Sequence, residues 1–234
     1  KETGGRPVVV HGHGNHDLKP IFTAVQEAFF EREHDSVDAG TEVSLFTCNN
    51  GHESLGLLEE TAGRLGVPVQ VFGQDRQEWS NAEDKPQVIL EALDTIGTEY
   101  VLYADSRDCI LLDSPQRALN QLRKCFADKQ LVFGADIVNW PPVLEFQRYE
   151  KRLAGPDCGR YRFLNGGCWM GKTRFCREFF TEVLKMEPAR EAPDSEQGLL
   201  KRLLPRYADE VALDYGTDLF FNCGFVAGDL IAFE

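Results

Sequence analysis

The sequence predicts an α/β protein with a mainly parallel central sheet flanked by helices. Apolar runs rich in β-branched and aromatic residues recur along the chain, and several are continuous, as expected for strands buried on both faces. Between these runs, apolar residues recur at three- and four-residue spacing, which is typical of amphipathic helices. The alternation of the two patterns predicts β-α-β connections and therefore parallel strands.

The order of the elements follows from these patterns. We expect strands at 7–11, 42–47, 67–73, 99–105, 130–136 and 162–171. We expect helices at 53–65, 86–96, 115–126, 173–186 and 194–204. Ser114 and Pro115 supply an N-cap and a first-turn proline for the third helix. The segment 31–40 is expected to be an exposed linker, and the segment 137–161 is expected to be irregular.

Length, charge and cysteine content limit the class of protein. The 234 residues suffice for one well-packed domain over 1–234, because a chain of this size buries around 70% of its unfolded surface. A net charge of -13 argues against nucleic acid as a partner, and no apolar run approaches the ~20 residues of a membrane span. The seven cysteines include no CxxC pair that would suggest a zinc or dithiol redox site. We expect a few disulfides in a secretory compartment plus one free thiol, with reduced buried cysteines as the alternative.

Histidines cluster near the start of the chain. The stretch VVVHGHGNHDLKP places His11, His13 and His16 within six residues, and imidazole is the commonest protein ligand for transition metals. The letters GNHD also occur in metal-dependent phosphoesterases, which makes such an enzyme one alternative. That chemistry needs two metals and further carboxylate and histidine motifs, and the two remaining histidines lie in no such pattern. A metal-binding role for the cluster is the hypothesis that remains.

Two carboxylates follow a predicted buried strand in a DxxD motif. The apolar run 100–103 leads directly into Asp105 and Asp108. Ligands of an open parallel sheet bind at the carboxyl ends of its strands, and two carboxylates at such a place can converge on one hard cation such as Mn²⁺ or Mg²⁺. The alternative is that both side chains cap the turn and face solvent.

Six segments occur in the order in which they occur in a known family. They are VSLFTCNN, FGQDRQEWSNAEDK, YADSRDCIL, FGADIVNWPP, RFLNGGCWMG and PDSEQ. From about residue 42 to 234 the chain resembles the glycosyltransferase domain of the collagen lysyl hydroxylases, an enzyme of the GT-A fold. The resemblance implies a Mn²⁺-dependent, retaining enzyme that transfers galactose or glucose from a UDP-sugar to a hydroxyl of a protein or peptide acceptor. It also implies a location in the lumen of the secretory pathway or outside the cell.

The resemblance implies a role for particular residues. Asp105 and Asp108 would bind Mn²⁺, and Trp79 would stack on the uracil. The nucleotide-sugar would further contact Cys48, Asn49, Lys85, Asp105, Ser106, Gly166, Gly167 and Lys19. Catalysis and acceptor binding would involve Asp194, Glu196, Gln197, Trp140 and Asn165.

Each role has a structural alternative. Trp79 can be an ordinary half-buried aromatic residue, and Lys85 a solvated surface charge. The segment 165–167 can form a β-bulge or tight bend. Asp194 and Glu196 lie at a predicted helix start, where acidic side chains are favoured by the helix dipole.

The chain departs from the family pattern at the third metal ligand. The family has a histidine in an L-D-H motif where this sequence has Tyr215, and a phenol with a pKa near ~10 is a poor ligand at neutral pH. The head of the chain resembles a P-V-x-x-H-G-N-G segment of the family and an H-x-x-G-x-x-K-P segment of glycogenin-like enzymes, so His13 or His11 would complete the metal site and Lys19 would bind a phosphate. Residues 1–30 would then correspond to the family's C-terminal segment, and the chain would be circularly permuted. The absence of the L-D-H histidine also permits a catalytically silent GT-A-like binding module.

Overall fold

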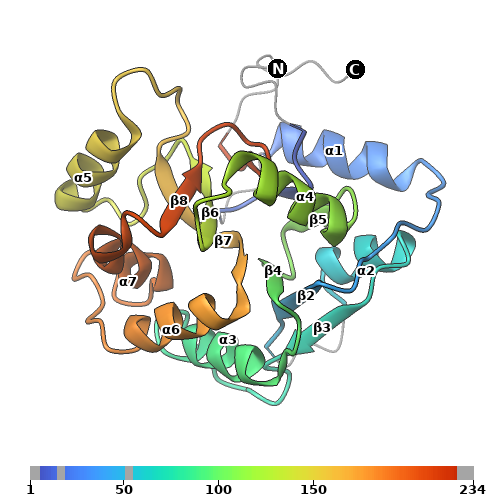
Figure 1. Cartoon of the computed structure of the whole chain (residues 1–234), viewed down its shortest axis with the longest axis horizontal. Helices are drawn as coiled ribbons and strands as arrows, with labels where there is room; N and C mark the ends of the chain where they lie inside the picture. Colours follow the sequence, from blue (N-terminus) through green and yellow to red (C-terminus); the bar gives the residue numbers. More distant parts are fainter. Residues whose placement is uncertain (1–5, 15–18, 51–54, 226–234) are drawn as a thin grey trace.

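Two β-sheets form the centre of the molecule (Figure 1). The computed structural model describes residues 6–14, 19–50 and 55–225. The large sheet has the strand order β3-β2-β4-β7-β6-β8, and a small sheet has the order β5-β1-β9. The strands of the large sheet are β2 (Val43–Cys48), β3 (Val69–Phe72), β4 (Tyr100–Ala104), β6 (Leu131–Asp136), β7 (Phe163–Lys172) and β8 (Val211–Asp214). Those of the small sheet are β1 (Val9–His11), β5 (Cys109–Leu111) and β9 (Phe220–Asn222).

The large sheet is mainly parallel, as the sequence predicts. β7 runs antiparallel to its neighbours β4 and β6, while the pairs β2–β3, β2–β4 and β6–β8 are parallel. Every residue of β4 and β6 is buried, which explains why these two strands read as continuous apolar runs. The predicted fold class, an α/β protein with a helix-flanked sheet of the GT-A type, is confirmed.

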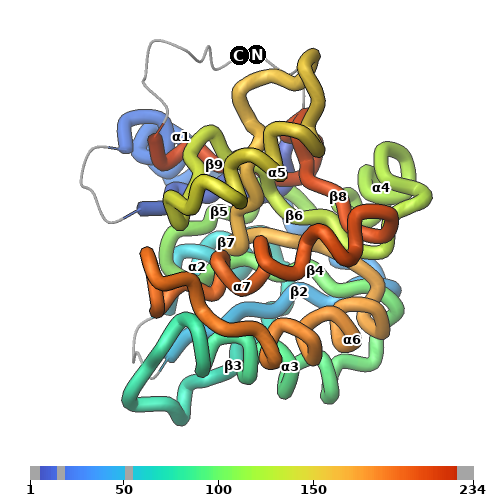
Figure 2. Tube along the Cα trace, turned by 90° about the vertical axis from the view of Figure 1, so that its left-hand side faces the viewer, coloured from blue at the N-terminus to red at the C-terminus, as the bar shows by residue number. Residues whose placement is uncertain are grey.

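Helices cover the sheet on both faces. They are α1 (Pro20–Phe30), α2 (Leu57–Arg64), α3 (Asp84–Thr95), α4 (Pro115–Cys125), α5 (Leu144–Ala154), α6 (Thr173–Val183) and α7 (Glu196–Leu203), followed by the 3-10 turn η1 (Leu204–Tyr207). The helices α3 and α6 lie in contact along one side of the sheet (Figure 2). The Ser114 hydroxyl accepts a hydrogen bond of 3.0 Å from the Arg117 amide, which confirms the predicted N-cap of α4. Within the described residues, no helix is long and apolar enough to cross a membrane.

Several elements differ from the sequence-based expectation. The helix α1 and the short strands β5, β8 and β9 were not predicted, and α5 occupies a segment that was expected to be irregular. The two buried residues of α5 are Phe146 and Glu150. Because one core-facing position holds a carboxylate instead of an apolar side chain, the apolar stripe that would have revealed the helix is interrupted. The segment 31–40 forms neither helix nor strand, as expected of the linker.

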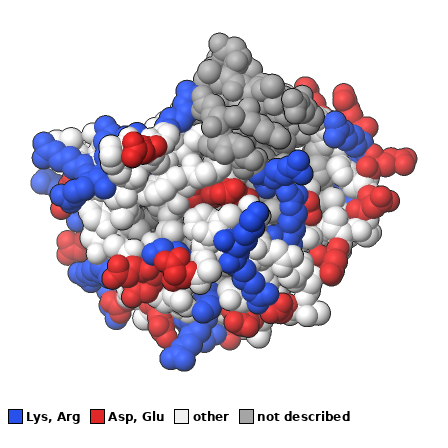
Figure 3. Space-filling model, turned by 45° about the horizontal axis from the view of Figure 1, so that its top comes forward, with Lys and Arg blue, Asp and Glu red and all other residues white. Residues whose placement is uncertain are grey.

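The first and last described strands meet in the small sheet. β1 pairs in parallel with β9 and antiparallel with β5, so the histidine-rich head of the chain is held beside the segment that follows β4. The seven cysteines are all free, so the expected disulfides do not form. On the face drawn in Figure 3, acidic and basic side chains are interspersed, although the chain carries a net charge of -13.

Candidate active site

A cavity of about 1010 Å³ opens where β1, β2 and β4 end. It is lined by most of the residues that the sequence singles out, namely His11, His13, Cys48, Trp79, Lys85, Asp105, Ser106, Asp108, Trp140, Asn165, Gly167, Asp194, Glu196 and Gln197. Asn49, Gly166 and Lys19 were also predicted to contact the ligand, but they lie outside this lining. The fold therefore brings together residues that span almost two hundred positions of the sequence. A single concave site of this kind is the usual location of a small-molecule substrate.

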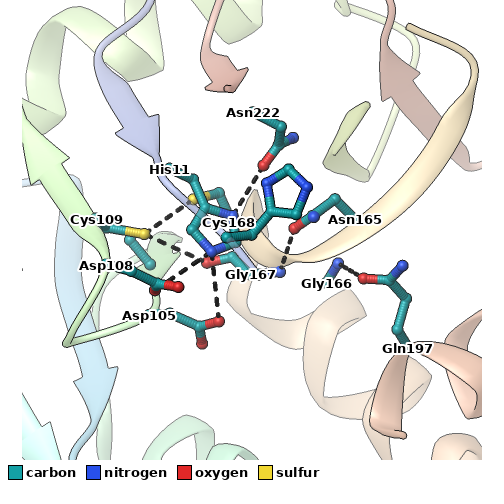
Figure 4. A network of polar contacts seen from close by, with 12 residues as sticks. His11, Asp105, Asp108, Cys109, Asn165, Gly166, Gly167, Cys168, Gln197 and Asn222 are labelled. Carbon is teal, nitrogen blue, oxygen red and sulfur yellow. Dashed lines mark hydrogen bonds and ion pairs between the residues drawn. The ribbon is translucent and has the colours of Figure 1, made fainter. Parts of the chain in front are cut away.

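His11 and the two carboxylates of the DxxD motif converge on one edge of the cavity (Figure 4). His11 Nε2 lies 3.3 Å from Asp108 Oδ1 and 4.0 Å from Asp105 Oδ2. Asp105 follows β4 and Asp108 precedes β5, while His11 ends the neighbouring strand β1. One ligand atom from each of the three side chains lies within 4.8 Å of the others, which is close enough to surround one cation. We call these three residues the carboxylate edge.

The His11 ring is oriented by the strand beside it. Its Nδ1 atom lies 2.8 Å from Asn222 Oδ1, and the Asn222 side-chain amide donates in turn to the Ala135 carbonyl. Since Asn222 Oδ1 can only accept, Nδ1 carries a proton in either charge state of the ring, and Nε2 faces the carboxylates. Although burial acts against it, the Asp108 carboxylate raises the pKa of His11 to about 10. In the absence of a cation, the imidazole itself carries the positive charge that balances this edge.

Asp105 is held by two further groups. Its Oδ1 atom accepts a hydrogen bond of 2.7 Å from the Tyr103 hydroxyl and lies 2.8 Å from Lys85 Nζ. Lys85 also donates to Glu196 Oε1 at 2.7 Å. Although burial opposes it, the pair of carboxylates raises the pKa of Lys85, which is only 7% exposed. Lys85 is therefore a buried cation that fixes Asp105, and it is not the solvated surface charge of the alternative reading.

His13 lines the same cavity, with its ring 5.3 Å from the His11 ring, but it pairs with a different carboxylate. His13 Nε2 lies 2.8 Å from Asp136 Oδ2, and its ring packs 5.2 Å from the Phe225 ring. Tyr215 is not part of the cavity lining. Asp214 accepts hydrogen bonds from three backbone amides of the turn that leads to β9. Of the two histidines proposed from sequence, His11 is the one beside the carboxylates.

Lys19 lies just before α1 and acts on the carboxylate edge through its charge. Burial would raise the pKa of Asp108, but the nearby His11 lowers it to about 2. The charge of Lys19 makes a smaller contribution in the same direction. The predictions for His16 and for most of the GNHD letters fall outside the described residues. His34, another of the five histidines, stacks on Phe29 at 4.0 Å and serves packing.

Gly167 permits the close approach of β7 to the carboxylate edge. The register of the β6–β7 pair jumps from Trp169 to Asn165, so residues 166–168 bulge out of the ladder. A Cβ atom on Gly167 would lie 2.2 Å from His11 Cε1 and 2.9 Å from Asp105 Oδ2. The β-bulge predicted as the structural alternative is present, and glycine is required because any side chain would displace the histidine.

Of the predicted nucleotide-binding residues, some leave a side chain facing the cavity, and others use their side chains in hydrogen bonds within the protein. Trp79 is half-buried, and its indole donates to Asn81 Oδ1 at 3.0 Å, leaving the ring beside the cavity. Ser106 and Asn49 both donate to the buried carboxylate of Glu59, Ser106 at 2.7 Å and Asn49 at 3.1 Å. Glu59 thereby links the segments that follow β2 and β4. The side chains of Asn49 and Ser106 hold these two loops together.

A second part of the cavity lining carries an exposed tryptophan on a supported loop. Trp140 is 52% exposed, and its carbonyl accepts a hydrogen bond of 2.6 Å from Gln197 Nε2. Gln197 Oε1 accepts from the Gly166 amide at 2.9 Å, which places Gly166 and Gln197 in one support. Lys201 lies 2.9 Å from both Asn139 Oδ1 and Glu150 Oε2. We call residues 137–143 with these supports the Trp140 side.

Asp194 and Asn165 also make internal contacts. Asp194 accepts hydrogen bonds from the Ser80 hydroxyl at 2.8 Å and the Ala82 amide at 3.2 Å, so it links the segment before α7 to the loop that bears Trp79. Asn165 donates to Asp136 Oδ2 at 3.1 Å and accepts from the Gly167 amide. Both residues line the cavity while part of their polar surface is already engaged.

Four residues that shape the site were missed from sequence. They are Glu59, Tyr103, Asp136 and Asn222. Asp136 could have been found, because it ends a buried strand in the letters FGAD as Asp105 follows one in YVLYAD. The other three contact residues that are distant in the sequence, and no local sequence pattern predicts such contacts.

Comparisons with known proteins identify a family and proteins similar to this chain. The family described as "PLOD GT domain" matches residues 42–197. A protein of Acanthamoeba polyphaga mimivirus, "Uncharacterized protein R699", is 26% identical over 133 residues, which are 56% of this chain and 27% of that protein. The chain thus spans about a quarter of the length of this curated relative. The structure titled "Crystal Structure of A197 from STIV" has a TM-score of 0.43 and 13% identity, and covers 75% of this chain and 83% of that one.

Proposed function

Because the chain belongs to the PLOD GT domain family of glycosyltransferases, we propose that it transfers a hexose, galactose or glucose, from a UDP-sugar to a hydroxyl of a protein or peptide. The proposed reaction depends on Mn²⁺ and retains the configuration of the sugar. The observation that carries the proposal is the convergence of His11, Asp105 and Asp108 on one edge of a cavity large enough for a nucleotide-sugar.

The donor set of the carboxylate edge fits Mn²⁺. Hard divalent ions prefer carboxylate oxygens as ligands, and first-row transition-metal ions also bind imidazole nitrogen. The ring of His11 already presents Nε2 toward the carboxylates, and Gly167 leaves the space that this arrangement needs. When bound there, Mn²⁺ would act as a Lewis acid that neutralises the diphosphate leaving group.

Residues of the chain supply binding and orientation around this edge. Lys85 and Tyr103 hold one oxygen of Asp105, so that the other oxygen is directed toward His11. Trp79 offers a ring face on which the uracil can stack. Trp140, on the second part of the cavity lining, offers an exposed ring to the sugar or to the acceptor. Cys48 lines the cavity at the end of β2, where its backbone can contact the nucleotide.

The proposal is tested by measuring UDP release. The protein is incubated with a panel of UDP-sugars and Mn²⁺, with and without peptides that contain hydroxyl acceptors. We expect release with a hexose donor that requires the metal and is lost in the Asp105→Ala and Asp108→Ala variants. Release that persists without metal, or no release with any donor, would contradict the proposal.

A second candidate is a catalytically silent module of the same fold. It is favoured by the internal pairing of the acidic groups, since Asp108 pairs with His11 and Asp105 with Lys85. Calorimetric titration with Mn²⁺ and UDP separates the two candidates. Saturable binding of both ligands supports the enzyme, whereas binding of neither supports the silent module.

A further inference from the structure

Two buried thiols lie directly behind the histidine of the carboxylate edge. Cys109 in β5 and Cys168 in β7 are both 0% exposed, and their sulfur atoms are 3.5 Å apart (Figure 4). One nitrogen of His11 and the two sulfurs all lie within 4.8 Å of one another. We propose that Cys109, Cys168 and His11 form a second metal site, specific for a thiophilic divalent ion such as Zn²⁺ or Cd²⁺.

The spacing of the sulfurs matches a shared metal ion better than a disulfide. Two thiolates bound to one tetrahedral Zn²⁺ at about 2.3 Å are separated by about 3.8 Å, close to the observed distance. A disulfide needs about 2.05 Å, so the two sulfur atoms would have to approach each other by about 1.5 Å. Both strands are fixed by their ladders, because β5 pairs with β1 and β7 pairs with β4. A metal ion requires only a small movement of the His11 ring.

The chemistry of the three ligands differs from that of the carboxylate edge. Thiolate and imidazole ligands select Zn²⁺ and other soft ions, whereas carboxylates suit Mn²⁺ and Mg²⁺. With a water molecule in the fourth position, two sulfurs, one nitrogen and one oxygen would surround a tetrahedral ion.

The two sites share His11 and therefore exclude each other. A soft ion that binds Nε2 takes the nitrogen that faces Asp105 and Asp108. A soft ion that binds Nδ1 breaks the hydrogen bond from Nδ1 to Asn222 Oδ1, which holds the ring in place. In either case, occupation of the thiol site weakens the carboxylate edge as a ligand set. The inference concerns metal binding alone and does not depend on glycosyl transfer.

Cobalt absorption tests the site without any sugar donor. Co²⁺ bound by thiolates gives an intense near-ultraviolet charge-transfer band, which carboxylate and imidazole ligands do not give. The reduced full chain is titrated with Co²⁺ as wild type, as Cys109→Ser and as Cys168→Ser. Cys176→Ser is the matched control, since Cys176 is equally buried but lies in α6. We expect the band in wild type and in the control, and at least about tenfold weaker Co²⁺ binding with loss of the band in the other two variants.

A second measurement on the wild type avoids any dependence on how the variants fold. X-ray absorption of the Zn²⁺-loaded protein should show two sulfur ligands at about 2.3 Å. Absence of sulfur ligands, a charge-transfer band that survives both serine substitutions, or a Cys109–Cys168 disulfide in the purified protein would each overturn the proposal. Zn²⁺ should also raise the apparent dissociation constant for Mn²⁺ in wild type.

Discussion

The two walls of the cavity treat charge in opposite ways. On the Trp140 side, Lys201 and Glu150 are 0% and 1% exposed and neutralise each other at 2.9 Å. On the carboxylate edge, the side chains of Asp105 and Asp108 remain 27% and 31% exposed. Asp108 pairs with His11, and Asp105 pairs with Lys85, which Glu196 shares. The first arrangement is closed and supports a loop. The second is open toward the cavity and gains from an added cation.

Removing one charged group is expected to have different consequences on the two walls. A buried pair without water around it leaves an uncompensated charge when one partner is replaced. Burial lowers the pKa of Lys201 and raises that of Glu150, and in each case the partner opposes the shift. The Trp140 side should therefore respond to substitution in stability, and the carboxylate edge in metal binding and turnover.

The largest expected effect lies on the carboxylate edge. Asp108→Asn keeps the shape of the side chain but removes its charge, so Mn²⁺-dependent turnover should fall by at least about 1000-fold. UDP release measured at saturating donor checks this. Asp113→Asn is the control, because Asp113 pairs with Arg117 outside the cavity and its loss should change turnover by less than about threefold. Similar losses in both variants would show that the effect is not local to the site.

The next effect lies on the Trp140 side and concerns stability. Lys201→Met leaves the buried Glu150 without its partner and should lower the free energy of unfolding by about 3–5 kcal/mol. Chemical denaturation measures the change. The double variant Lys201→Met with Glu150→Leu should recover much of the loss, since it buries no charge. A double variant less stable than the single one would mean that the pair does more than neutralise itself.

The pH dependence of stability separates the walls further. In the metal-free protein the pKa of His11 is raised from 6.5 to about 10, so the stability that it contributes is complete below pH 6.5 and is lost as the pH rises toward 10. Urea unfolding with a chelator should show a fall on the order of a few kcal/mol over this window. His11→Gln should flatten the curve, and an unchanged fall would assign the dependence to another group.

The smallest effect comes from the residue that orients the histidine. Asn222→Ala removes the contact to His11 Nδ1 and should weaken Mn²⁺ binding by about 10–100-fold, as for other groups that orient metal ligands. Calorimetric titration measures this. Asn120→Ala on the surface of α4 is the matched control and should leave the affinity unchanged.

The sequence predicts the walls to different extents. The carboxylate edge is announced by local patterns, because Asp105 directly follows a continuous apolar strand and His11 ends another. Local patterns do not predict the supports of the Trp140 side, because Glu150 and Lys201 look like surface charges in the sequence. Their burial follows from the packing of α5 and α7. Register explains the choice between His11 and His13. Both fit a metal-ligand pattern, but only the pairing of His11 with Cys109 across β1 and β5 places one of them beside Asp108.

The circular permutation inferred from the head of the chain stays a prediction. A permuted chain requires its first strand to lie beside β9, where the family's chain would continue after β9. The parallel pairing of β1 with β9 has this arrangement. A variant in which residues 1–30 are moved to the C-terminus should fold and should bind Mn²⁺ as the original chain does.

The central claim is that His11 joins Asp105 and Asp108 in one metal site. Electron paramagnetic resonance of free Mn²⁺ during titration, in the presence of UDP, measures this binding directly in wild type, His11→Gln and His13→Gln. We predict one tight Mn²⁺ site in wild type, binding weakened by at least about tenfold in His11→Gln, and a change below about threefold in His13→Gln. Mn²⁺ binding that is absent from wild type, or that is lost in His13→Gln and retained in His11→Gln, would contradict the account.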